Sequence, residues 1–313
     1  IDHVCLSLPN KKVLDGEMMV NIILQVIING LLMGGIYAMA AIGLTMIWGV
    51  MNFINFASGQ MTMFGMYITL ILSIGMNIDP LAAVMITVII MFIMGLFIEK
   101  IVIEPIVLSP RLYQVVVSIA MGLILEYLAF TIWGAEIKSM PKTLGSMKFL
   151  SKVMDFGLIR LSPTRFIPLP AAIILTISLH YFLTRTRLGL GIRGVAQNTT
   201  AAYLMGIDVR RTYTLTWGLG VSFMGLSGGF LMLFQPAYPA VGLEFILISF
   251  IAVTLGGAGS YVGTFIGAVV MGVVEALSGF FLFPALRQVV YLSLFVIMLF
   301  IRPTGLFPTK EAG

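Results

Sequence analysis

Residues 18–78 read MMVNIILQVIINGLLMGGIYAMAAIGLTMIWGVMNFINFASGQMTMFGMYITLILSIGMNI, without a single Asp, Glu, Lys or Arg. One crossing of a bilayer needs about 20 consecutive apolar residues, so this stretch is long enough for at least two crossings. The whole chain of 313 residues is 59% hydrophobic and only 10% charged, whereas a soluble domain carries about 25% charged residues. The sequence therefore predicts an integral membrane protein.

Further apolar stretches of helical length follow, and they predict an all-α polytopic bundle. We expect transmembrane helices near residues 20–50, 59–77, 81–103, 113–133, 166–184, 212–235, 243–256, 261–279 and 287–301. The stretch at 243–256 is short for a full crossing and ends in a glycine-rich turn, so a broken or re-entrant helix is expected there. The bundle then has eight or nine crossings. It occupies residues 18–307, between a polar N-terminal segment (1–17) and a short tail (308–313).

The charges lie mainly in two polar loops, 134–165 and 185–211. Cytoplasmic loops usually carry the excess of Lys and Arg, but placing 185–211 inside leaves nine basic residues on each side, so this rule does not orient the chain. The net charge of +5 fits loops beside anionic lipid and not a nucleic-acid-binding face. One cysteine and two histidines argue against a metal site. Neither a catalytic motif nor a nucleotide phosphate loop is found, so the sequence predicts no enzyme.

The loop 185–211 reads RTRLGLGIRGVAQNTTAAYLMGIDVRR and contains one short helix with its own start and stop signals. Asn198 or Thr199 can cap its start, and Gly206 suits the left-handed position after its end. Ala201, Leu204 and Met205 share one face by their spacing. A helix of this length is unstable alone in water. It therefore rests either on the membrane or its own protein, or on a partner.

The segment GVMNFINFASGQ (49–60) places amides between two uncharged stretches. If it is helical, Asn52 and Asn55 share a face that Ser58 and Gly59 continue toward Gln60. Polar side chains at membrane depth are costly unless they are paired or face a water-filled path. Two interpretations stay open: a discontinuous helix lining a pathway, or a helix-end turn whose amides cap neighbouring helices.

Glycines and acids within the apolar stretches give two more sets of candidates. Gly225 with Gly229, and Gly263 with Gly267, form GxxxG pairs that predict close helix packing. The glycine-rich turn before the second pair could instead bind an anion. Three acids lie near membrane depth. The sequence places Glu99 at the interface, while Glu126 and Glu275 lie deeper, as structural carboxylates or as proton-coupling groups.

Several of these segments together resemble a known family. The run GIYAMAAIGLTMIWG (35–49) leads into MNFINFASGQ (51–60), and later come IRGVAQNTTAAYLMGIDVRR (192–211), LGGAGSYVGTFIGAVVMGVVEALSGF (255–280) and IRPTGLF (301–307). In this order they resemble the LivH-type permeases of high-affinity branched-chain amino acid ABC transporters. The match covers nearly the whole chain from about residue 20.

The resemblance implies a permease subunit that imports leucine, isoleucine, valine or related apolar amino acids through the cytoplasmic (inner) membrane of a bacterium or archaeon. Its implied partners are a LivM-like second permease, two LivG/LivF-like ATP-binding subunits that hold ATP and Mg, and an extracytoplasmic binding protein. The chain itself would hold no cofactor. The resemblance also places 185–211 and the C-terminus in the cytoplasm, and 134–165 outside. It implies ATPase-coupling residues Arg193, Asn198, Thr199, Ala201, Ala202, Leu204, Met205, Gly206 and Asp208.

The sequence departs from the family pattern at two places. The family commonly has His-Gly-Glu where this chain has Ser58-Gly59-Gln60, and often Arg where Glu104 precedes Pro105. These departures leave the exact substrate open, because urea, short-amide and some sugar permeases share the architecture. An ion-gradient-driven secondary transporter using Glu126 or Glu275, and a purely structural subunit, are the alternatives from other classes.

Overall fold

The computed structural model describes residues 11–142, 144–150, 154–155, 160–282, 286–302 and 305–307. The expected tail (308–313) and most of the expected N-terminal segment lie outside these residues. Within the described part the regular secondary structure is helical apart from one pair of two-residue antiparallel strands. The prediction of an all-α polytopic membrane protein is confirmed.

A helix is present at each of the nine expected positions. They are α1 (Lys11–Met51), α2 (Ser58–Gly75), α3 (Pro80–Ile98) with a π-helical turn (Glu99–Ile103), α4 (Arg111–Trp133), α7 (Pro168–Arg185), α10 (Val209–Met232), α11 (Gly242–Gly256), α12 (Tyr261–Phe281) and α13 (Arg287–Ile301). The shorter elements are α5 (Met147–Leu150), β1 (Met154–Asp155), β2 (Arg160–Leu161), α6 (Pro163–Phe166), α8 (Arg187–Gln197), α9 (Thr199–Leu204) and the 3-10 turn η2 (Pro239–Val241). Seven of the described helices are long and apolar enough to cross a membrane. Helices α2 and α13 are the other two of the nine at the expected positions.

Proline and glycine set several of the helix ends. Pro80 and Pro168 stand in the first turns of α3 and α7, where a missing N–H costs nothing. Gly134 (φ +76°) follows α4 and Gly257 (φ +100°) follows α11. A residue with a Cβ rarely adopts such angles, so the helices stop where the local sequence directs.

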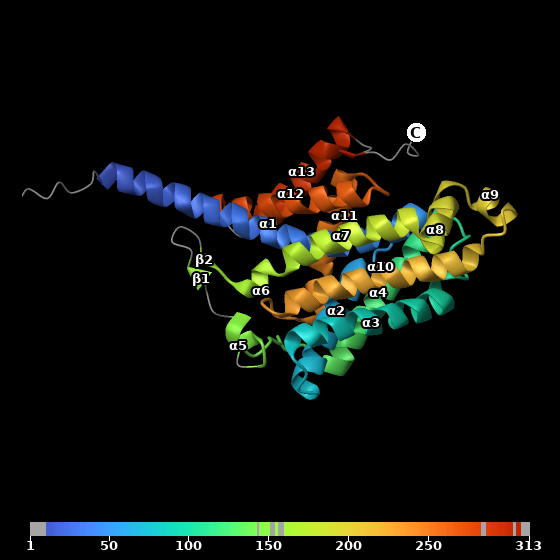
Figure 1. Cartoon of the computed structure of the whole chain (residues 1–313), viewed down its shortest axis with the longest axis horizontal. Coiled ribbons are helices and arrows are strands. Elements are labelled where there is room, and N and C mark those ends of the chain that lie inside the picture. Colours follow the sequence, from blue (N-terminus) through green and yellow to red (C-terminus); the bar gives the residue numbers. More distant parts are fainter. Residues whose placement is uncertain are drawn as a thin grey trace, which may run out of the picture.

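The central helix is α1, which packs against α12, α10, α7 and α11, while α10 also packs against α2 and α3. Figure 1 shows these long helices running roughly side by side along the molecule. Glycines permit the close approach. At Gly34 and Gly272, for example, a Cβ would collide with the backbone of the facing helix. Small residues at such contacts are the usual means of packing helices in lipid.

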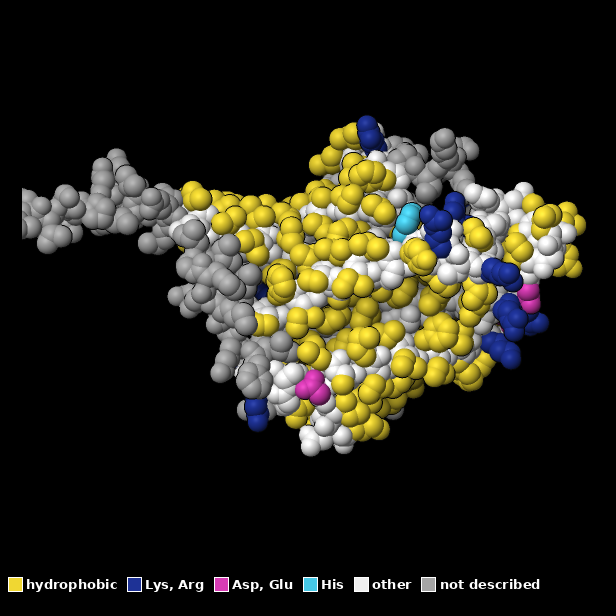
Figure 2. Space-filling model, viewed as in Figure 1, with side chains coloured by type: hydrophobic (Ala, Val, Ile, Leu, Met, Phe, Trp, Pro, Cys, Tyr) yellow, Lys and Arg dark blue, Asp and Glu magenta, His cyan; other side chains and the backbone are white. Residues whose placement is uncertain are grey.

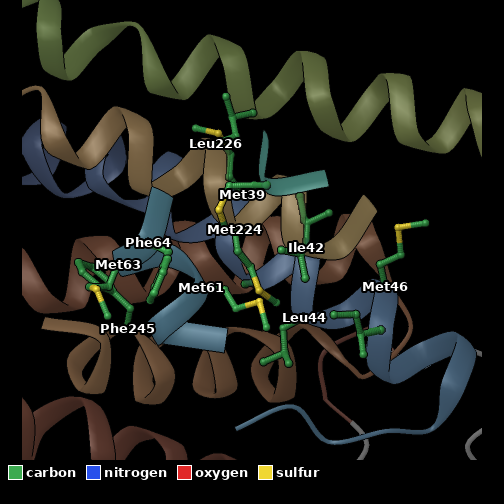
Figure 3. Packing of buried hydrophobic residues seen from close by; sticks show 14 of the residues in the cluster. Met39, Ile42, Leu44, Met46, Met61, Met63, Phe64, Met224, Leu226 and Phe245 are labelled. Atoms are coloured by element: carbon green, nitrogen blue, oxygen red, sulfur yellow. The ribbon is translucent and has the colours of Figure 1, made fainter. Parts of the chain in front are cut away.

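Methionine-rich packing fills the centre of the bundle. Figure 3 shows side chains of Met39, Met61, Met63 and Met224 among Ile42, Leu44, Phe64 and Phe245, all of them buried. Buried hydroxyl groups join helices across this core: Thr45 bonds Thr264 (2.7 Å), and Thr69 bonds Thr87 (2.8 Å). The flexible thioether fills irregular gaps, while the hydroxyl pairs fix which helix lies against which.

The two ends of the bundle carry different segments (Figure 1). We call the end with α8, α9 and Arg185, Arg187, Arg193, Arg210 and Arg211 the basic end. The chain after α13 returns to this end, because the N–H groups of Leu306 and Phe307 donate to the carbonyls of Leu255 and Gly256. The segment with α5, β1, β2 and α6 lies at the opposite end.

A broken or re-entrant helix was expected at 243–256, but the helix there is continuous. With η2, α11 extends over Pro239–Gly256, about 27 Å at 1.5 Å per residue. It starts beside the Lys138–Ala237 bridge at the opposite end and finishes at the basic end, where Gly259 lies against Gly49. Residues 52–57, between α1 and α2, are not helical.

Candidate functional site

The loop 185–211 contains two helices, so the expectation of a single helix was wrong. The additional helix, α8, begins at Thr186, whose Oγ1 accepts a hydrogen bond from the Gly189 N–H (3.0 Å). Its buried face consists of Gly189, Ile192 and Val195. Gly189 lies so close to the backbone of α7 that a Cβ would not fit. Several glycines lower the intrinsic helix propensity of this segment, and packing on α7 compensates for that deficit.

Helix α9 has the start and stop that its sequence predicts. The Asn198 side-chain Oδ1 accepts a hydrogen bond from the Ala201 N–H (2.9 Å). Gly206 adopts φ +82°, and the Ile207 N–H donates to the Ala202 carbonyl (3.0 Å). Ala202 is the buried residue of this helix, so α9 is fixed on its own protein by a very small contact.

The remaining apolar residues of α9 face solvent. Tyr203, Leu204 and Met205 are 71%, 79% and 83% exposed, and Ala201 is also exposed. Figure 2 shows dark blue Lys and Arg side chains gathered around this end, while hydrophobic side chains cover the middle of the molecule. A contiguous exposed apolar surface with a polar rim is typical of a protein interaction site.

The other residues expected in the coupling segment lie around α9. Thr199 Oγ1 donates to the Val195 carbonyl (3.2 Å), which links α9 to α8. Asp208 Oδ1 accepts from the Arg211 N–H (3.0 Å) and so caps the start of α10. Arg193 is exposed on α8 and lines a cavity of about 650 Å³ that α7 and the ends of α1 and α12 also border.

Asn52 and Asn55 do not share a helix face, because residues 52–57 are not helical. Asn52 is exposed with φ +54°, and it accompanies the end of α1 into the cavity that holds Arg193. Asn55 is fully buried, and its Oδ1 accepts from the Ala57 N–H (2.9 Å) just before α2. Asparagine tolerates the left-handed conformation and forms such local turns. Asn52 therefore follows the end of α1, and Asn55 forms the turn that precedes α2.

Asn55, Ser58 and Gln60 form a buried polar cluster at the start of α2, with side chains 0%, 1% and 2% exposed. Gln60 Nε2 donates to Glu126 Oε2 on α4 (3.5 Å). Within the described part of the chain, Asn55 Nδ2, Ser58 Oγ and Gln60 Oε1 have no hydrogen-bond partner. Buried polar atoms are nearly always paired, so this cluster has unused capacity to bind a polar group.

Gly59 permits this arrangement, since a Cβ there would collide with the Gly242 carbonyl at the start of α11. The structure thus brings together four of the expected pathway residues, Asn55, Ser58, Gly59 and Gln60, with Glu126. It leaves Asn52 apart from them. The expected shared helix face of Asn52 and Asn55 is wrong, because residues 52–57 form the connection between α1 and α2.

The three acids differ in their surroundings. Glu126 and Glu275 are half-buried on α4 and α12. Glu99, which was expected at the membrane interface, is 1% exposed. Its burial follows from packing, because α3 and α10 meet closely at Gly95 and Gly218 and α10 contacts the π-helical turn.

The glycines expected in helix packing all lie in tight contacts. Gly225 lies against Met91 and Gly229 against Thr69 and Val84, while Gly263 and Gly267 lie against Gly256. The turn before α12 was the alternative anion site. Its Gly257, Ser260 and Gly263 N–H groups donate within the protein, so they are not available to an anion. The described residues contain no group of three or more His, Cys, Asp or Glu side chains that could hold a metal ion.

Residues 26–299 match the model of a family described as the permease component of branched-chain amino acid transport systems. The chain belongs to this family. It is 30% identical to the high-affinity branched-chain amino acid transport permease BraD of Pseudomonas aeruginosa over 298 residues, 92% of this chain and 96% of that protein. It is 28% identical to LivH of Escherichia coli over 92% of this chain and 96% of that protein. A probable LivH of the archaeon Methanocaldococcus jannaschii is 27% identical, over 85% and 86%.

Membership in this family makes the chain a transport component, and its apolar helices make it a multi-pass membrane protein. The α9 segment (residues 198–208) and the polar cluster at the start of α2 are therefore parts of a permease.

Proposed function

We propose that this chain is a permease subunit of an ATP-driven importer for leucine, isoleucine, valine or related apolar amino acids. It would act in the cytoplasmic (inner) membrane with a LivM-like second permease, two ATP-binding subunits and an extracytoplasmic binding protein. Family membership supports the transport role and the substrate class. The exposed apolar surface of α9 is the observation that carries the coupling role, because nothing in the described chain covers it.

In this proposal the basic end and the C-terminus lie in the cytoplasm, and α9 docks on an ATP-binding subunit. Closure of the ATPase pair moves α9, and α8 and α10 transmit the motion to the bundle, since both contact α9. The ATP-bound and ATP-free states must contact α9 differently, because a ligand shifts an equilibrium only through its differential affinity. Leu204 and Met205 would provide that contact.

The pathway would include the polar cluster of Asn55, Ser58, Gln60 and Glu126. A zwitterionic amino acid brings an ammonium and a carboxylate group. The Glu126 carboxylate suits the first group, and the Asn55 amide and Ser58 hydroxyl suit the second. Their unpaired atoms support this role. The surrounding apolar side chains suit an aliphatic substrate.

The coupling role is tested by paired substitutions in the reconstituted complex. Leu204→Asp should abolish ATP-dependent uptake, because it places a charge in the apolar contact, whereas Leu204→Met should transport normally. Gly206→Pro should also abolish uptake, whereas Gly206→Asn should retain it, because Asn tolerates a left-handed C-cap. Insertion and expression are checked for each variant. Normal uptake by both disruptive variants would disprove the coupling role.

The substrate and energy source are tested with the unmodified complex in proteoliposomes. We expect uptake of leucine, isoleucine and valine that requires ATP and the binding protein, without uptake of urea. Uptake that survives ATP depletion but stops when the proton gradient collapses would instead identify a secondary transporter.

A further inference from the structure

Helix α3 reaches the start of α10 next to the α9 segment. The two helices pack closely, since a Cβ at Gly95 of α3 would lie 3.0 Å from the Gly218 Cα of α10. The C-terminal end of α3 therefore lies over the first two turns of α10. Any link between these two ends also fixes the chain that leads from α9 into α10.

The end of α3 carries two carboxylates that a π-helical turn aligns. The Glu104 N–H donates to the Glu99 carbonyl (2.8 Å), which is an i→i+5 hydrogen bond. Residues five apart point in different directions in an α-helix, which has 3.6 residues per turn. A π-helical turn contains more residues per turn, so residues five apart lie nearly one above the other. Glu99 and Glu104 thus face α10 together.

Two residues one turn apart on α10 meet these carboxylates. Arg210 forms an ion pair with Glu104, whose side chain is only 17% exposed. Thr214, four residues further along, lies near the buried Glu99, and its hydroxyl donates to the Arg210 carbonyl (3.1 Å). Residues four apart lie on one face of a helix, so the pair on α3 matches the pair on α10.

Apolar side chains do not pack across the space between the α3–α4 connection and the α9 segment. A cavity of about 670 Å³ separates the α3–α4 connection from the α9 segment, and Leu108, Tyr203, Ile207 and Tyr213 line it. Leu108 is 89% exposed and Tyr203 71%. The apolar groups on the two sides of this cavity leave space between them, so near this cavity the Glu104–Arg210 ion pair is the contact that joins the α3–α4 connection to the start of α10.

We propose that the ion pair of Glu104 and Arg210 forms a clamp that positions the α9 segment relative to α3. Glu104 is then a positioning residue that acts through Arg210. The functional consequence rests on the proposed function, because a misplaced α9 matters only if an ATP-binding subunit docks there. The geometric consequence holds for the permease itself.

The geometric part is tested by pulsed electron paramagnetic resonance on the purified full-length permease. Spin labels at Leu108→Cys and Met205→Cys, in a Cys5→Ser background, report the distance across the cavity. We expect a broader distribution in Glu104→Arg and in Arg210→Glu, and the original distribution in the double charge swap. Arg211→Glu is the matched control, because it changes the net charge equally one residue away. Unchanged single variants, or a swap that fails to restore the distribution, would overturn the clamp.

The functional part uses the same variants in the complete reconstituted transporter. Each single variant should lower uptake by about tenfold, because two like charges then face each other at the contact between positions 104 and 210, and the swap should restore it. If the distance broadens and uptake stays normal while Leu204→Asp abolishes uptake, the positioning role is overturned. If Leu204→Asp also transports normally, the proposed coupling function fails, and the distance measurement alone decides whether the clamp exists.

Discussion

Asp79 connects two segments through one carboxylate. Its Oδ1 accepts from the Leu81 N–H (3.0 Å) and so caps α3. The same group accepts from the backbone N–H of Ser146 (2.8 Å) and from the Ser146 hydroxyl (2.9 Å) in the connection before α6. One residue therefore starts a transmembrane helix and attaches the loop at the opposite end to it.

The pH dependence of this attachment follows from its hydrogen bonds. Partial burial acts to raise the pKa of Asp79, but the bonds from Ser146, Leu81 and Ala82 outweigh it and hold the pKa below the ordinary 3.8. A lowered folded-state pKa means that the stabilisation is present above the ordinary value and is lost as pH falls through the folded-state pKa. A spin label at Lys142→Cys should therefore be immobile at neutral pH and become mobile below the ordinary Asp value.

The matched variant for this prediction is Asp79→Asn, which keeps the shape and removes the charge. Its label should be more mobile at neutral pH and should change little on acidification. A label whose mobility follows the same pH curve in both proteins would show that another group controls the loop.

At the scale of whole elements, glycine contacts decide how closely the helices pack. A Cβ at Gly272 of α12 would collide with the backbone of α1 at Gly30 and Gly34, whereas a Cβ at Gly75 of α2 would meet only the Ile71 side chain at 3.8 Å. Overpacking of a tight contact costs about 1–3 kcal/mol, and sometimes more. We expect Gly272→Leu to lower the thermal unfolding midpoint in detergent clearly, and Gly75→Leu to leave it nearly unchanged.

Equal thermal unfolding midpoints of the two variants would show that α1 and α12 can move apart without loss of stability. Separation is the only means of relief there, because the groups facing Gly272 are backbone atoms and cannot change rotamer.

The elements that the sequence predicted correctly are those with a local cause. The apolar stretches gave all nine long helices, and Asn198 and Gly206 gave the ends of α9, because capping depends on residues a few positions apart. The elements that it missed depend on distant neighbours. Helix α8 is stabilised by its packing on α7, and Glu99 is buried because α10 packs against it. Periodicity within one segment contains no information about either partner.

The start of α2 combines both cases. The sequence marked Asn55, Ser58 and Gln60 as polar residues in an apolar region, and the structure buries all three. Their partner Glu126 lies 66 residues away from Gln60, so no local pattern joins the two. The sequence left open whether residues 52–57 continue a helix or form a turn, because Asn is compatible with both; the structure has no helix there.

At the scale of the molecule, the path of the chain constrains its topology. Both 185–211 and the described residues 305–307 lie at the basic end (Figure 1). Four long helices, α10 to α13, lie between these two segments. An even number of crossings returns the chain to the same side, so the two segments must share a compartment whichever way the protein is inserted.

Labelling of single cysteines tests the topology and the orientation separately. In a Cys5→Ser background, a membrane-impermeant maleimide should label Ser139→Cys in intact cells or spheroplasts. It should label Met205→Cys and Phe307→Cys only after the membrane is opened; all three positions are exposed in the fold. Met205 and Phe307 must behave alike because the segment after α13 is bonded to the end of α11. Labelling of these two from different sides would contradict the fold, whereas labelling of both from outside would preserve the fold and eliminate α9 as the site of an internal ATPase.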